Sequence, residues 1–149
     1  MFPGRITHAT VNVLDFLAER LLPQIKIASH LRTGHRGEED AYFYLRRLGY
    51  IMVARNFRSP RRHGEIDMIG WHKDVLCFIE VKTRTSHDVK PAETAVDRRK
   101  WRQLSATARE YLRSFPSDLE WRFDLITVYY DRQSGLPQFQ LFQNALPSS

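Results

Sequence analysis

Cysteine is nearly absent from this sequence. Its 149 residues include one cysteine, Cys77, so no disulfide bond can form within the chain. Cys77 lies in the apolar segment VLCFI, where a small buried side chain is a simpler interpretation than a reactive thiol. We therefore expect a protein of the reducing cytoplasm.

Long hydrophobic runs are absent too. No apolar stretch approaches the roughly 18 residues that a membrane span needs, so we expect no membrane partner. A secretory signal pattern is also missing, because the N-terminal segment VNVLDFLAERLL carries Asp15, Glu19 and Arg20 inside its apolar part.

Several catalytic signatures are missing as well. The sequence has no glycine-rich phosphate loop and no nucleophile elbow, which argues against a nucleoside triphosphatase or a serine hydrolase. Its 6 histidines show no paired spacing of the kind that metal ligands have. A zinc site is therefore not expected.

Basic residues, by contrast, are in excess. Lysine and arginine number 23 against 17 aspartate and glutamate, which gives a net charge of +6. Much of this charge lies in two short segments, 55–63 (RNFRSPRRH) and 97–102 (DRRKWR), and aromatic residues stand beside both. The pattern favours a polyanionic partner such as nucleic acid. A merely solvated basic surface is the simpler alternative, and charge alone does not decide between them.

The chain reads as an N-terminal extension followed by one domain. In the extension, residues 1–33, the segment 11–22 predicts a short amphipathic helix that ends near Pro23. That helix could pack on the domain, on a partner or on a membrane surface, and packing on the domain is the expected outcome. Residues 34–149 are long enough to form a domain with its own core.

Apolar residues at helical spacing predict two helices in the domain, and alternating or β-branched segments predict the strands. In chain order we expect a helix over 37–49, strands over 50–57, 64–71 and 75–84, a helix over 92–115, and strands over 119–131 and 139–142. The core order α-β-β-β-α-β predicts an α/β fold of three layers, with a mixed central sheet flanked by helices. The last strand is expected at a sheet edge.

Charged residues interrupt the strand VLCFIEVKTR. Side chains alternate between the faces of a strand, so Leu76, Phe78, Glu80 and Lys82 share one face. This face begins apolar and ends with a carboxylate and an ammonium group. Such a strand is expected to leave the core and deliver its last side chains to a cleft.

A second acid is expected to meet Glu80 across a hairpin. If Lys73 and Asp74 form a two-residue loop, Asp67 lies directly opposite Glu80, with Cβ atoms about 5 Å apart. Lys-Asp is an unfavourable pair for the usual two-residue turns, so the register is a hypothesis. This register predicts that Asp67 faces Glu80 in the structure.

Two carboxylates this close repel each other. At an effective dielectric constant of about 20, unit charges 4 Å apart cost roughly 4 kcal/mol. Either one acid holds a proton or a cation lies between them, and carboxylate oxygens suit Mg²⁺ (or Mn²⁺). Lys82 is placed to orient or deprotonate a water molecule there. Glu38, on the apolar stripe of the first helix, could support the site or help to bind a second metal. Solvated strand ends or a simple salt bridge are the alternative.

Five segments in series carry a family resemblance: GEEDAYFYLRRLGY, RNFR, GEIDMIG, FIEVKTR and RFDLITV. Over about residues 34–130 the chain resembles the bacterial YraN-like family of predicted endonucleases. That family is similar to Holliday-junction resolvases and to the wider PD-(D/E)xK nuclease superfamily. The resemblance implies a restriction-endonuclease-like αβββαβ core and metal-dependent hydrolysis of DNA, branched or structured DNA included. It also implies a homodimer, as in resolvase-like proteins.

The resemblance assigns roles to individual residues. Asp67 matches the metal-binding aspartate of the motif, Glu80 the second acid, Lys82 the motif lysine and Glu38 the acid of the first helix. The backbone carbonyl of Val81 would be a further metal ligand. One departure is that isoleucine, at position 66, stands where the superfamily often has proline. This is usual for the YraN-like pattern.

Several basic residues are candidates for contact with nucleic acid, where cations usually bind phosphates without reading sequence. They are Arg55, Arg58, Arg61, Arg62, Arg84, Arg98, Arg99 and Lys100. Gln103 could orient groups near the site, whereas Arg122 and Asp124 are expected to form a structural ion pair. Two other functions stay open: a non-catalytic nucleic-acid-binding module on a nuclease fold, and an adaptor that binds a protein through its N-terminal helix.

Overall fold

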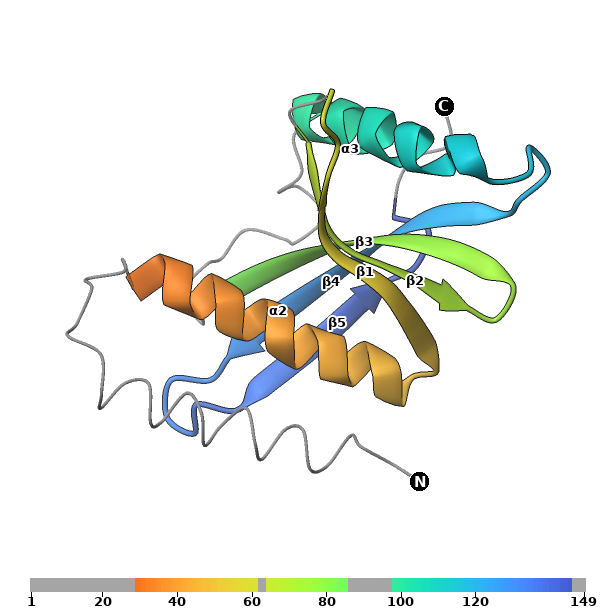
Figure 1. Cartoon of the computed structure of the whole chain (residues 1–149). Coiled ribbons are helices and arrows are strands. Elements are labelled where there is room, and N and C mark those ends of the chain that lie inside the picture. Colours follow the sequence, from red (N-terminus) through yellow and green to blue (C-terminus); the bar gives the residue numbers. More distant parts are fainter. Residues whose placement is uncertain (1–28, 62–63, 86–97, 146–149) are drawn as a thin grey trace, which may run out of the picture. The chain divides into compact units, whose positions relative to one another are not determined.

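The computed structural model describes residues 29–61, 64–85 and 98–145 (Figure 1). The chain divides into two units, Met1–Thr33 and Gly34–Ser149. The helix expected within residues 11–22 lies outside the described residues, and so does Arg62.

The described helices and strands follow the predicted order, and strand β5 closes the series. They are α2 (Ser29–Arg47), β1 (Tyr50–Arg58), β2 (Glu65–His72), β3 (Val75–Thr85), α3 (Arg98–Tyr111), the short 3₁₀ helix η2 (Leu112–Ser114), β4 (Trp121–Tyr130) and β5 (Pro137–Phe142). Within these ranges the strands form one five-stranded sheet in the order β1-β2-β3-β4-β5. Strands β3 and β4 are parallel and the other neighbours are antiparallel. The expected mixed sheet is therefore confirmed.

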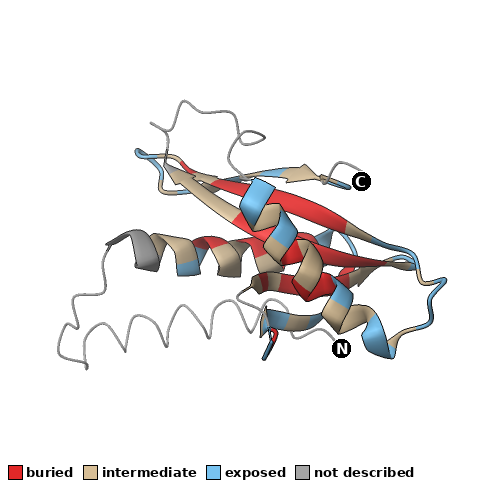
Figure 2. Cartoon of the chain, turned by 90° about the horizontal axis from the view of Figure 1, so that it is seen from above, coloured by how far each residue is buried: buried red, intermediate tan, exposed pale blue. Residues whose placement is uncertain are grey.

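Helices cover both faces of this sheet (Figure 1). The apolar stripe of α2 packs on one face, in a cluster that includes Ala41, Leu45, Met68, Ile79 and Ile126. Helix α3 packs on the other face, in a cluster that includes Leu104, Ala108, Ile66, Phe78 and Phe123. Buried residues run along the central strands, as Figure 2 shows. Because β3 and β4 are parallel, the chain must return across the sheet between them, and α3 lies within that connection.

The end of α2 follows the predicted signal. Gly49 has φ 92°, in the left-handed region that glycine adopts readily, and its N–H donates to the carbonyl of Arg46 at 3.1 Å. The chain then enters β1 at Tyr50.

The β2–β3 hairpin has the predicted register. His72 pairs with Val75, so Lys73 and Asp74 form the two-residue loop. Lys73 takes the positive φ, 56°, that such a loop requires. Regular pairing extends among the described residues as far as Met68 opposite Ile79.

Cys77 is fully buried, which confirms that it is a core side chain. None of the helices in the described ranges is long and apolar enough to cross a membrane.

Candidate active site

Strand β3 continues past its apolar residues to Glu80 and Lys82, but neither side chain is among the described residues that line the pocket beside the site, so the expected delivery to a cleft stays a prediction. Leu76 and Phe78 are fully buried, and Glu80 is only 3% exposed. The Lys82 ammonium donates to Glu80 Oε1 at 2.8 Å. The strand therefore ends in a largely buried acid–base pair.

Asp67 lies beside this pair from the neighbouring strand β2. The register places it next in line after Met68, which pairs with Ile79. Its Oδ2 atom accepts the backbone N–H of Val81 at 2.7 Å. Asp67 is thus held by the residue that follows Glu80, and the two acids interact electrostatically. Val81 touches Asp67 through its N–H, and the metal-binding role of its carbonyl stays a prediction.

A second lysine, which the sequence predicts as a nucleic-acid contact, completes the cluster. Lys100 of α3 also donates to Glu80 Oε1, the oxygen that Lys82 contacts. The other oxygen, Glu80 Oε2, is buried and has no hydrogen-bond partner among the residues that the structure describes. One side of this carboxylate therefore meets both ammonium groups, and the other side leaves a buried acceptor for a ligand.

Burial and repulsion raise the pKa of two acids of the site, Asp67 and Glu38. Burial, and next the charge of Glu80, raise the pKa of Asp67 to about 7, although the Val81 N–H opposes this shift. Burial also raises the pKa of Glu38, with smaller contributions from Glu65 and Glu80. Glu38 therefore interacts electrostatically with Glu80, and its supporting role stays a prediction. A cation bound between Asp67 and Glu80 would offset the repulsion and the burial that raise the pKa of Asp67.

The lysines respond to the cluster in opposite directions. Burial lowers the pKa of Lys82, and the neighbouring Lys100 adds to the decrease against the attraction of Glu80. For Lys100, burial also acts to lower the pKa, but Glu80 outweighs it and the pKa is raised. Lys82 therefore loses its proton more readily than Lys100, which is the more persistent cation.

A pocket of about 520 Å³ opens beside the acids, between the start of β2 and α3. The described residues that line it are Gly64, Glu65, Asp67, Arg99, Lys100, Gln103 and Leu104. Gln103 lies next to the site, as expected. The pocket connects Asp67 and Lys100 with solvent, so a substrate can approach them from this side.

Two glycines allow close approaches around the site. A Cβ atom on Gly37 of α2 would overlap the hydroxyl of Thr83 and lie 3.1 Å from its Cβ. Likewise, a Cβ on Gly64 would overlap the hydroxyl of Thr107 on α3. Gly37 thus lets α2 lie against the end of β3, next to Glu38. The sequence offered no sign of this role beyond the glycine itself.

The Gly37 contact gives a test of this packing. Gly37→Ala is expected to destabilise the protein by about 1–3 kcal/mol, because the added methyl collides with Thr83. In a Thr83→Ala background the same change is expected to cost about 1 kcal/mol or less, since the overlapping hydroxyl is gone and only the 3.1 Å contact with the Cβ of residue 83 remains. Urea unfolding of the four proteins measures this coupling. Equal effects of Gly37→Ala in both backgrounds would contradict the contact.

The donor set fits a magnesium ion, or manganese. Asp67 and Glu80 supply carboxylate oxygens, and the buried Oε2 of Glu80 is an acceptor with no described hydrogen-bond partner. No three acid, histidine or cysteine side chains within residues 29–61, 64–85 and 98–145 converge closely enough to hold a metal by themselves. Mg²⁺ often binds through only one or two carboxylates, with water and phosphate oxygens as its other ligands. Asp67 and Glu80 therefore supply the type and number of ligands with which a protein commonly holds Mg²⁺.

Most of the predicted phosphate-binding residues lie on the surface, but some have partners in the protein. Arg55 pairs with Glu39 at 3.0 Å and lies over the ring of Tyr42, and Arg58 pairs with Glu65 at 2.7 Å. The others divide by exposure: Arg61, Arg98 and Arg99 are exposed, and Arg84 is half-buried.

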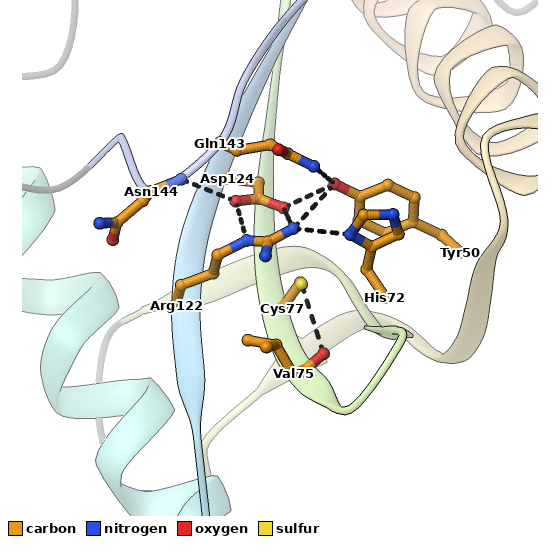
Figure 3. A network of polar contacts seen from close by, with 8 residues as sticks. All are labelled: Tyr50, His72, Val75, Cys77, Arg122, Asp124, Gln143 and Asn144. Carbon is orange, nitrogen blue, oxygen red and sulfur yellow. Dashed lines mark hydrogen bonds and ion pairs between the residues drawn. The ribbon is translucent and has the colours of Figure 1, made fainter.

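Arg122 and Asp124 form the expected ion pair, within a larger buried network (Figure 3). Asp124 is fully buried and accepts from Arg122 Nε at 2.8 Å, from the Tyr50 hydroxyl at 2.9 Å and from the Asn144 N–H at 2.9 Å. Arg122 also contacts His72 Nδ1 at 3.0 Å. Because the described donors and acceptors satisfy one another, we interpret this network as structural.

Comparison with known proteins identifies related chains. A family model described as "Uncharacterised protein family UPF0102" matches residues 37–128, which include every acid and lysine of the site. A UPF0102 protein of Koribacter versatilis is 49% identical over 139 residues, 93% of each chain. One of Solibacter usitatus is 45% identical over 98 residues, 64% of this chain and 73% of the relative. One of Porphyromonas gingivalis is 38% identical over 121 residues, 81% of this chain and 88% of the relative.

Proposed function

Since the chain belongs to UPF0102, a family of uncharacterised proteins, its activity has to be argued from its own site, and we propose that it is a metal-dependent endonuclease. The expected YraN-like family is thereby confirmed, whereas the relationship to nucleases is part of the proposal. The reaction is hydrolysis of phosphodiester bonds in DNA, including branched or structured DNA.

One observation carries this proposal: Asp67, Glu80 and Lys82 form a largely buried cluster next to a pocket, which Asp67 lines together with Arg99 and Lys100. The order α2-β1-β2-β3-α3-β4 supports it, because the restriction-endonuclease-like core has the same order. The basic surface residues Arg61 and Arg98 are suited to phosphate contacts. A homodimer remains a prediction.

The chain's own residues have separable roles in this reaction. Asp67 and Glu80 would hold the divalent cation, which would supply stabilisation of negative charge on the phosphate and a more acidic water. Lys82, whose pKa burial lowers, orients the attacking water and accepts its proton. Glu38 adds negative charge close to the cation. The pocket admits the DNA strand beside Asp67.

Cleavage assays test the proposal directly. Linear, nicked and four-way DNA substrates are incubated with Mg²⁺ or Mn²⁺, and cleavage of at least one is expected. Asp67→Ala and Glu80→Ala should each lower the rate by about 100-fold or more, because each removes a carboxylate that would hold the cation. Arg102→Met, an exposed charge change on α3, is the matched control. Cleavage that survives both alanine substitutions would refute the assigned site.

A non-catalytic nucleic-acid-binding module is the second candidate. It is favoured by the ammonium groups of Lys82 and Lys100, which together neutralise Glu80 without any metal. Such a module would bind DNA with a steep dependence on salt, would cleave nothing, and would show no divalent-cation binding in calorimetry.

A further inference from the structure

Lys100 occupies an unusual place for a surface residue. It comes from α3, within the connection between β3 and β4, yet it contacts the same oxygen of Glu80 as Lys82 does. A lone salt bridge would need one lysine. The second ammonium group places two positive charges on a single buried carboxylate oxygen, which is the charge that a divalent cation would bring.

The lysines also differ in access to solvent. The Lys100 side chain is 39% exposed and the Lys82 side chain 22% exposed. Lys100 lines the pocket beside Asp67, whereas Lys82 is not among the described residues that line it. Lys100 can therefore leave Glu80 by moving into the pocket, because its four-carbon stem is flexible and its ammonium group needs no fixed geometry.

We propose that Lys100 is an exchangeable counter-ion, which neutralises Glu80 in the metal-free protein and moves into the pocket to bind a DNA phosphate when a divalent cation takes its place. The inference rests on the proposed metal site and adds a positioning residue to it. Repulsion between the cation and the ammonium group expels Lys100 from Glu80. In the pocket, beside Arg99, a phosphate oxygen then replaces the carboxylate as its partner.

Two consequences follow from this exchange. Without DNA, Lys100 competes with the cation and weakens its binding. With DNA, the phosphate holds Lys100 away from Glu80, so that metal and DNA each strengthen the binding of the other. A lysine with a merely structural role would produce neither effect.

Calorimetry with Mg²⁺ or Ca²⁺ alone tests the first consequence in the full-length chain. Lys100→Met is expected to bind the cation about tenfold more tightly than the parent, as is usual for coupling between neighbouring charges. Lys100→Gln, which keeps a hydrogen-bond donor without the charge, should behave in the same way and guards against a folding defect in the first variant. Arg102→Met removes an exposed positive charge from the same helix and should change the affinity little.

DNA binding tests the second consequence. With Ca²⁺ as the cation, Ca²⁺ is expected to strengthen DNA binding by the parent, and this enhancement should shrink severalfold in Lys100→Met. Unchanged cation affinity in both Lys100 variants would overturn the exchange while leaving the metal site intact. Absence of cation binding in the parent and in both variants would overturn the metal site as well, so the two failures are distinguishable.

Discussion

Asp67→Asn is expected to stabilise the metal-free protein by about 2–4 kcal/mol at pH 8, and to abolish DNA cleavage. Asparagine keeps an oxygen that can accept the Val81 N–H, so the geometry of the site is preserved. What it removes is a buried negative charge next to Glu80. A residue that destabilises the fold while it serves the function is common at active sites.

The expected pH dependence follows from the Asp67 pKa. Burial, and then Glu80, raise it from 3.8 to about 7 in the folded protein. Between these values the folded protein holds a proton that the unfolded chain has lost, so stability falls as the pH rises from about 4 to about 7. Above about pH 7 the free energy of unfolding falls no further. The total decrease is roughly 1.4 kcal/mol for each unit by which the pKa of Asp67 differs between the folded and unfolded chains.

Urea unfolding of parent and variant between pH 4 and pH 9, with a chelator present, measures this difference. The two free energies of unfolding should converge near pH 4 and separate as the pH rises. Asp118→Asn, at an exposed position, is the matched control and should show no such divergence. A variant that is less stable than the parent at pH 8 would contradict the assigned environment of Asp67. Without the chelator, Mg²⁺ should stabilise the parent but not the Asp67→Asn variant.

Asp124→Ala is expected to destabilise the protein by about 3–5 kcal/mol, the loss usual when one partner of a buried ion pair is removed. The substitution leaves the Arg122 guanidinium, the Tyr50 hydroxyl and the Asn144 N–H without their shared acceptor. Burial, with a contribution from Asp124, raises the pKa of Tyr50 to about 12, so the hydroxyl keeps its proton at neutral pH and needs an acceptor.

A variant series separates the charge from the hydrogen bonds in this network. Asp124→Asn keeps an acceptor without the charge and should lose less stability than Asp124→Ala. The double variant Arg122→Met/Asp124→Leu removes both charges, and is also expected to be more stable than Asp124→Ala, since no lone charge remains buried. Urea unfolding at pH 7 measures all three. If the double variant is the least stable, the ion pair contributes more than this reasoning allows.

Local rules predicted several features of the site. Alternation of side chains along β3 placed Glu80 and Lys82 on the face of Leu76, because a strand repeats every two residues. A two-residue loop between His72 and Val75 then set the β2–β3 register. Both steps use short-range geometry, which depends little on the rest of the fold.

Other features needed contacts between distant elements. The periodicity of α3 predicts a helix but not the angle at which it lies on the sheet, so it predicts Lys100 as a nucleic-acid contact and gives no sign that Lys100 is a partner of Glu80. The approach of Gly37 to Thr83 depends likewise on how α2 lies against β3.

The sequence by itself determined the order of helices and strands, the register of the β2–β3 hairpin, and the acids and the lysine that strands β2 and β3 bring to one place. Only the tertiary structure decided the electrostatics of that place. Desolvation and repulsion depend on what surrounds each group in three dimensions, and these effects raise the pKa of Asp67 to about 7. The position of α3 on the sheet likewise decides that Lys100 reaches Glu80.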